Sequence, residues 1–240
     1  MNEYYEEKLS AERLQKCYEI APPRIRRYLD AETSFVIGRI QGNRRVLELG
    51  CGYGRLMKRV AAHVKFVVGC DTSRSSLRFA KRYMRSRGNF DLLCADGSCL
   101  PFRPGTFDAV FCAQNGISAF GVDRRKLVAE AIRVAEDGGQ ILFSSYSHRI
   151  WKERLAWFRA QARAGLIGEI DESETGHGTI VCKDGFRAET VSRREFERLF
   201  SAGGASPHIQ EIDGSSLFCL ARKHVERGST RRHFQRLSIP

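Results

Sequence analysis

Three glycines at alternate positions, Gly50, Gly52 and Gly54, follow a short apolar segment that contains Glu48. A helical pattern of apolar residues begins directly after them. Glycine lets the backbone turn tightly and lets a ligand come close, and the first N–H groups of the next helix point toward that ligand. The order of strand, glycine turn and helix predicts a nucleotide site in an open α/β sheet.

The spacing of the glycines separates two kinds of nucleotide. A dinucleotide site has the pattern G-x-G-x-x-G, but Arg55 stands where its third glycine belongs. Glu48 would also repel a pyrophosphate, whereas it would not repel a ligand with an ammonium and a sulfonium group. The segment resembles motif I of the class I S-adenosylmethionine-dependent methyltransferases, which is an acidic residue, one spacer and G-x-G-x-G. We therefore expect S-adenosyl-L-methionine as the cofactor, rather than NAD.

A second acid, Asp71, ends the apolar run of residues 64–71, which has the composition of a parallel strand buried on both faces. It lies 21 residues after Gly50, and an acid at that distance is placed to accept hydrogen bonds from a ribose diol. Asp71 also suits the N-cap of the helix that follows. We favour the ribose role because the acid occurs together with the glycine turn.

Two later segments resemble further motifs of these methyltransferases. Asp96 and Gly97 match positions that in the family meet the adenine amino group and a ring nitrogen. Gln114 and Asn115 follow the next apolar strand, whose end in the family holds the methionine moiety and faces the substrate. The resemblance spans roughly residues 45–147. It implies a cofactor site made of Glu48, Gly50, Cys51, Gly52, Asp71, Thr72, Asp96, Gly97, Gln114 and Asn115.

The elements that carry these positions alternate between apolar strand-like runs and amphipathic helices. Five strands are expected to begin near residues 46, 64, 90, 107 and 140, and two closing strands near 207–212 and 216–222. The resemblance implies an α/β fold with a doubly wound, mostly parallel, seven-stranded sheet of the Rossmann-like class I methyltransferase type. Its last strand is expected to be antiparallel.

We divide the chain into five expected segments. They are an N-terminal helical cap (1–44), a Rossmann-like cofactor-binding core (45–147), a substrate-lid insertion with a hairpin (148–191), a closing helix with an antiparallel strand pair (192–224) and a basic, disordered tail (225–240). One helix is expected over residues 3–19. An N-terminal extension of this family commonly lies over the cofactor, so Tyr18 and Tyr28 are candidate ligand contacts. The alternative is that both tyrosines are half-buried packing residues.

A sulfonium is already an activated methyl donor, so the protein mainly aligns the nucleophile and excludes water. A general base is needed only if the nucleophile carries a proton at neutral pH. Tyr146, His148 and His177 are the candidate substrate-side residues, although His148 reads equally well as a surface histidine. An acidic stretch at residues 169–174 would suit an amine if it faced the pocket. We assign no catalytic residue.

Composition limits the remaining choices. The net charge of +12 would attract nucleic acid or acidic ligands, but charge runs usually form a solvated surface. The eight cysteines contain no C-x-x-C pair, which indicates a reducing compartment and no metal site. The chain starts with polar residues and contains no apolar run of about 20 residues. We therefore expect a cytoplasmic protein with no membrane partner.

The expected function is methyl transfer to a nitrogen, oxygen or sulfur atom of a small molecule, by a monomer or homodimer. One alternative is an RNA or protein methyltransferase that uses the basic surface. Against it, Gln114-Asn115-Gly116 does not resemble the Asn-Pro-Pro-aromatic motif of amino-group methyltransferases. A second alternative is a non-catalytic nucleotide-binding protein.

Overall fold

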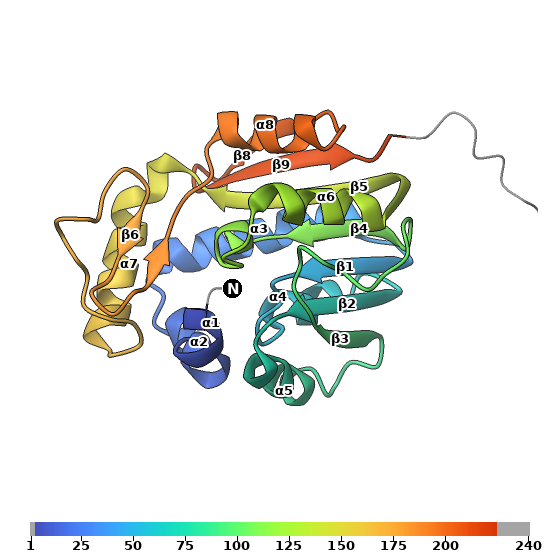
Figure 1. Cartoon of the computed structure of the whole chain (residues 1–240). Helices are drawn as coiled ribbons and strands as arrows, with labels where there is room; N and C mark the ends of the chain where they lie inside the picture. The colour runs from blue at the N-terminus through green and yellow to red at the C-terminus, as the bar shows by residue number, and fades with distance from the viewer. Residues whose placement is uncertain (1–2, 225–240) are drawn as a thin grey trace, which may run out of the picture.

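The computed structural model describes residues 3–224, and its central feature is one sheet of seven strands in the order β3-β2-β1-β4-β5-β9-β8 (Figure 1). The pairs β3·β2, β2·β1, β1·β4 and β4·β5 are parallel, whereas β9 is antiparallel to both of its neighbours. The predicted α/β sheet with an antiparallel last strand is thereby confirmed. The strands are β1 (Arg45–Leu49), β2 (Phe66–Asp71), β3 (Phe90–Cys94), β4 (Phe107–Cys112), β5 (Ala135–Tyr146), β8 (His208–Ile212) and β9 (Ser216–Arg222).

The strand order reverses at β1, which pairs with β2 on one side and β4 on the other. Leu47 of β1 lies opposite Val68 of β2 and Val110 of β4 in the register. The ends of these strands therefore lie at one edge of the sheet. In an open α/β sheet the crevice at such a switch point is the usual ligand site. The glycine turn and the segment after β4 meet there.

Helices cover both faces of the sheet because each strand in its centre is apolar on both sides. One face packs against α3 (Pro23–Ile40), α4 (Arg55–Val60) and α5 (Arg74–Tyr83). The other packs against α6 (Arg124–Val134) and α8 (Arg193–Ala202). In Figure 1, α6 lies in front of the sheet and α3 behind it. The Ser192 side chain caps α8 by accepting the Glu195 N–H at 3.2 Å.

A third apolar cluster joins the N-terminus to the region after β5. It packs α1 (Glu3–Glu7), α2 (Ala11–Glu19) and the start of α3 against α7 (Trp151–Arg163) and the hairpin of β6 (Ile180–Val181) and β7 (Arg187–Ala188). Of the two short 3-10 helices, η1 (Gly116–Ser118) lies between β4 and α6, and η2 (His148–Ile150) leads from β5 to α7. Figure 1 shows α1, α2, α7 and β6 grouped beyond one edge of the sheet.

The single helix predicted over residues 3–19 is wrong, because the chain breaks between α1 and α2. Ala11 has a φ of +49°, a conformation that non-glycine residues rarely adopt, and its N–H donates to Ser76 Oγ at 3.0 Å. A tertiary bond thus sets the break. The five-segment division stays a prediction, and the tail at 225–240 lies outside the described residues. Within residues 3–224, the helices are too short or too polar to cross a membrane.

Candidate functional site

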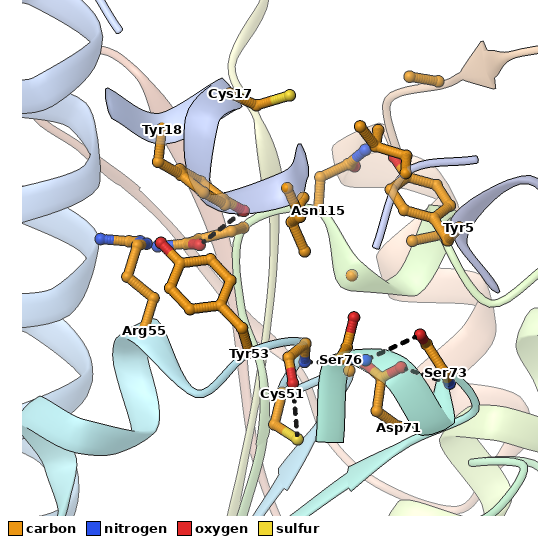
Figure 2. Close-up of a pocket in the computed structure, with 18 of the residues that line it drawn as sticks. Tyr5, Cys17, Tyr18, Cys51, Tyr53, Arg55, Asp71, Ser73, Ser76 and Asn115 are labelled. Carbon is orange, nitrogen blue, oxygen red and sulfur yellow. Dashed lines mark hydrogen bonds between the residues drawn. The ribbon is translucent and has the colours of Figure 1, made fainter. Parts of the chain in front are cut away.

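A cavity lies between the ends of the central strands and the third apolar cluster. Its empty volume is about 1180 Å³, including the part that opens to solvent. In Figure 2, Cys51 and Asp71 lie on one side of the cavity and Tyr5, Cys17 and Tyr18 on the other. We call these two sides the sheet half and the cap half. The sheet half is lined by Glu48, Gly50, Cys51, Gly52, Asp71, Thr72, Gln114 and Asn115, and the cap half by Tyr5, Leu9, Leu14, Cys17, Tyr18, Tyr146, Trp157, Phe158, Gln161, Phe186 and Ala188.

The glycine turn forms the floor of the sheet half. Gly50, Gly52 and Gly54 have φ values of +75°, +52° and +82°. A residue with a side chain would be strained in this backbone conformation. A Cβ on Gly52 would also lie 3.1 Å from a methyl carbon of Leu14 in α2. The turn is held to β2 because the N–H groups of Gly50 and Cys51 both donate to the Cys70 carbonyl. The positive φ values therefore favour glycine at all three positions of this cradle, and at Gly52 the approach of α2 leaves little room for a side chain.

Asp71 fixes this cradle from the end of β2. Its Oδ2 accepts the Gly52 N–H at 2.8 Å and its Oδ1 accepts the Ser73 N–H at 2.9 Å. Burial raises the pKa of Asp71, and the hydrogen bonds from backbone N–H groups oppose that rise. The N-cap of α5 is Ser73, whose side chain accepts the Ser76 N–H. Ser73, and not Asp71, is therefore the N-cap residue of α5. Asp71 lines the cavity beside Thr72.

Glu48 is a buried acid with an unsatisfied oxygen. Its side chain is 5% exposed, and within the described residues its Oε2 has no hydrogen-bond partner. Burial raises the pKa of Glu48 well above its usual value, and the Arg55 charge opposes this. A buried polar atom without a partner is costly, so such an atom in a cavity indicates a missing donor. Because the acid stands beside a glycine cradle, the site fits a ligand with an ammonium group.

The segment after β4 is held in an unusual backbone conformation. Gln114 and Asn115 have φ values of +55° and +61°. The Asn115 side chain is fully engaged, since Oδ1 accepts from Ser145 Oγ at 2.6 Å and Nδ2 donates to the Glu189 carbonyl at 2.8 Å. Gln114 Nε2 is buried and has no partner in the described chain. The amide of Gln114, rather than that of Asn115, is therefore available to a ligand.

Sequence reasoning missed the residue that holds Gln114. Glu32 of α3 is fully buried, and its Oε2 accepts the Gln114 N–H at 3.0 Å while its Oε1 accepts from Ser216 Oγ. Ser144 Oγ accepts the same Gln114 N–H at 2.9 Å. Burial raises the pKa of Glu32 to about 7, against the hydrogen bonds it accepts. No local signal reveals this role, because Glu32 is separated from these partners by at least 82 positions.

The cap half is aromatic and closed by contacts between distant segments. Tyr18 packs 6.0 Å from Trp157 between ring centroids, and the Trp157 indole N–H donates to the Cys17 carbonyl at 2.9 Å. The Arg55 guanidinium lies 4.6 Å from the Tyr18 ring centroid. Tyr28, by contrast, does not line the cavity. It is fully buried, and its ring centroid lies 5.2 Å from that of Tyr146. Tyr28 is therefore a packing residue, as in the alternative given for it above, rather than a residue that faces the cavity.

Several other candidate residues lie away from the cavity. His148 and His177 are exposed and do not line it. Asp96 and Gly97 are also outside its lining: Asp96 Oδ1 accepts from the Ser98 N–H at 2.7 Å, and a Cβ on Gly97 would meet Phe120 at 2.9 Å. Phe120, which itself lines the cavity, therefore stands between Gly97 and the glycine turn.

The acidic stretch at residues 169–174 does not face the cavity. Glu169 forms an ion pair with Lys183 at 2.8 Å, and Glu172 pairs with Arg159 at 2.7 Å, all on exposed side chains. The basis for an amine substrate, an acidic loop over the pocket, is therefore absent. Residues 3–224 contain no group of three or more His, Cys, Asp or Glu side chains placed to hold a metal ion.

Comparison with known proteins identifies the fold and the family. A family model described as a methyltransferase domain matches residues 46–139. A demethylmenaquinone methyltransferase of Streptomyces avermitilis is 30% identical over 71% of this chain and 72% of its own length. A malonyl-[acyl-carrier protein] O-methyltransferase of Legionella pneumophila is 33% identical over 55% of this chain and 47% of its own length. The crystal structure of the PH0226 protein of Pyrococcus horikoshii matches with a TM-score of 0.62 and 20% identity, over 93% of this chain and 99% of that one.

For several of the curated relatives the match spans only about half of their own length. The Streptomyces relative is matched over more than two thirds of its length. The family model covers the glycine turn, Asp71 and the segment after β4, which are the parts that line the sheet half. From this agreement of sequence, fold and site, the chain belongs to the class I S-adenosylmethionine-dependent methyltransferases.

Proposed function

We propose that this protein transfers a methyl group from S-adenosyl-L-methionine to a small molecule bound in the cap half of the cavity. The observation that carries the proposal is the unpartnered Glu48 Oε2 beside a glycine cradle, in the same cavity as an aromatic chamber. Transfer of a methyl group between two bound molecules needs two adjoining binding sites, and the sheet half and the cap half adjoin in one cavity.

The sheet half supplies the groups that would hold the cofactor. Glu48 accepts hydrogen bonds from its ammonium group, and Asp71 accepts them from its ribose diol. Gln114 offers a buried N–H donor, and Asn115 holds the segment that carries Gln114. When bound, the cofactor supplies a methyl group already activated by a positively charged sulfur. The roles of Thr72, Cys51, Asp96 and Gly97 remain proposals, and the last two require Phe120 to move.

The cap half would position the substrate and exclude water. Trp157, Phe158 and Phe186 line it with apolar rings, and Tyr18 and Tyr146 add hydroxyl groups. Within the described chain the cavity lining contains no histidine or lysine, so the nucleophile has no obvious general base. Alignment and desolvation are then the main contributions of the protein.

Two observations favour a small molecule over RNA or another protein. In the described chain, α1, α2, α7 and the β6–β7 hairpin pack into an apolar cluster that borders the cavity, rather than into a basic trough beside the cradle. The name of the relative from Streptomyces avermitilis refers to demethylmenaquinone, which is a small molecule. A cytoplasmic location and a monomer or homodimer stay predictions.

Calorimetric titration with S-adenosylhomocysteine and, separately, with NAD tests the proposal. We expect the first to bind and the second not to bind. Glu48→Gln keeps the shape of the side chain but removes its charge, so it should weaken S-adenosylhomocysteine binding, whereas Glu197→Gln on the exposed face of α8 should not. Binding of NAD alone would overturn the proposal. A crystal structure with S-adenosylhomocysteine would then show which atoms of the cap half face its sulfur.

A further inference from the structure

Arg154 of α7 is a fully buried cation directly behind the wall of the cap half. Its two terminal nitrogens donate to the carbonyls of Gly178 and Ala188, each at 2.9 Å. Its guanidinium carbon lies 4.3 Å from the Tyr146 ring centroid and 5.5 Å from that of Phe158. Tyr146, Phe158 and Ala188 all line the cavity, so one layer of side chains separates this charge from the chamber.

No carboxylate of the described residues neutralises this charge. Among residues 3–224, no acidic side chain forms an ion pair with Arg154, and its Nε is buried without a hydrogen-bond partner. Buried arginines are normally paired, because removing a charge from water is expensive. Carbonyl oxygens and ring faces hold Arg154 in place, but they leave its full positive charge uncompensated.

The positive field reaches the cavity wall. Burial raises the pKa of the Tyr146 hydroxyl, whereas the Arg154 charge lowers that pKa. Glu32, whose charge raises the pKa of Tyr146, is held by Gln114 and Ser216 and does not line the cavity. The acids that do line it, Glu48 and Asp71, belong to the sheet half.

This arrangement discriminates between nucleophiles. An ammonium-forming amine would lose its water in the cap half, where the described lining side chains carry no carboxylate and the Arg154 charge lies behind the Tyr146 and Phe158 rings. An acidic hydroxyl on a flat ring would instead pack against the aromatic walls, and its anion would be stabilised by the cation behind them. An anion also needs no general base at the moment of transfer, which agrees with a lining without histidine or lysine.

We propose that the cap half binds a planar phenol as its phenolate and that Arg154 is the residue that determines this specificity. The inference rests on the proposed function. The phenol proton leaves to solvent on binding. A lone pair of the phenolate oxygen forms the new O–C bond as the S–C bond breaks, and the S–C pair stays on sulfur. An anion and a sulfonium cation thereby become a neutral ether and a neutral thioether.

The test uses 4-nitrophenol, whose phenolate absorbs visible light, as a probe of the chamber. The wild-type protein, Arg154→Lys and Arg154→Met are titrated with the probe, each with and without S-adenosylhomocysteine, at a pH below the pKa of the free probe. We expect the wild-type protein to raise the ratio of phenolate to phenol about tenfold over free solution. Arg154→Lys should keep most of this effect because it keeps the charge, and Arg154→Met should lose it.

Two outcomes would overturn the inference: an Arg154→Met variant that raises the phenolate ratio as strongly as the wild-type protein, or a wild-type protein that binds benzylamine at least as tightly as the phenol. If Arg154→Met does not fold, the comparison of phenol with benzylamine on the wild-type protein decides alone. Failure of S-adenosylhomocysteine to bind counts against the proposed function instead, because the probe titration without it still measures the field in the chamber.

Discussion

Glu32 connects α3 to the segment after β4 beside the cavity, and its replacement by glutamine gives a quantitative test. The carboxyl group is fully buried between α3, β4 and β9, and burial raises its pKa from 4.5 to about 7. A glutamine side chain has nearly the same shape. Its amide oxygen is able to accept the Gln114 N–H, and the Ser216 hydroxyl is able to rotate and accept from its NH₂.

The sign of the effect follows from the direction of the pKa shift. Between pH 4.5 and pH 7 the folded protein holds a proton on Glu32 that the unfolded chain has released. The stability that this proton contributes is complete below pH 4.5 and is lost as the pH rises through 7. A difference of about 2.5 pKa units corresponds to about 3 kcal/mol of unfolding free energy. Glu32→Gln carries no such proton, so relative to the wild-type protein it should gain about this amount as the pH rises to 8.

Denaturant unfolding at pH 5, 6, 7 and 8 measures this difference directly. The free-energy difference between Glu32→Gln and the wild-type protein should rise steadily over this range, whereas Glu197→Gln, on the exposed face of α8, should give a constant difference. A constant difference for Glu32→Gln as well would refute the reasoning, because it would mean that the buried carboxyl titrates as it does in the unfolded chain.

Three other changes probe the cavity and the fold. Asp71→Ala should weaken S-adenosylhomocysteine binding by about 1–3 kcal/mol through loss of hydrogen bonds to a charged group, while Asp91→Ala on exposed β3 should leave the calorimetric affinity unchanged. Gly52→Val should abolish that binding, because position 52 has a positive φ and lies close to α2. Circular dichroism should show that the sheet is retained. Gly88→Val, with open space around the side chain, should bind normally. Ser192→Ala should lower the unfolding free energy by about 1 kcal/mol in urea, since it removes the cap of α8, and an unchanged midpoint would contradict this.

The parts that the sequence predicts well depend on neighbouring residues. The glycine turn, Asp71 and the strands of the central sheet are local patterns, and a turn that requires positive φ at Gly50 and Gly52 leaves a direct signature in residue type. The Asp213-Gly214 turn between β8 and β9 is predictable for the same reason. Family resemblance then supplies the order of the strands, which local patterns alone do not give.

The parts that it does not predict depend on residues far apart in the chain. The bond between Glu32 and Ser216 joins residues 184 positions apart, and the bond of Ala11 to Ser76 breaks a helix that local propensity favours. His148, a candidate substrate-side residue with an equally good surface interpretation, lies exposed in η2 and outside the cavity lining, and this exposure depends on how η2 packs. Charge patterns mislead as well, since the acidic stretch near Glu172 serves surface ion pairs.

Hydrogen bonds between residues that are far apart in the sequence hold the cap half together. The Tyr4 hydroxyl donates to Asp184 at 2.6 Å, and Arg13 donates to the carbonyls of Gly165 and Leu166. Loop closure over such separations is slow and entropically costly, whereas the parallel pairs around β1 join nearer neighbours. We therefore expect the chamber to assemble after the parallel strand pairs around β1. A chain that ends before α7 lacks the helix and hairpin that pack against α1 and α2, so we expect it to lack a complete cap half.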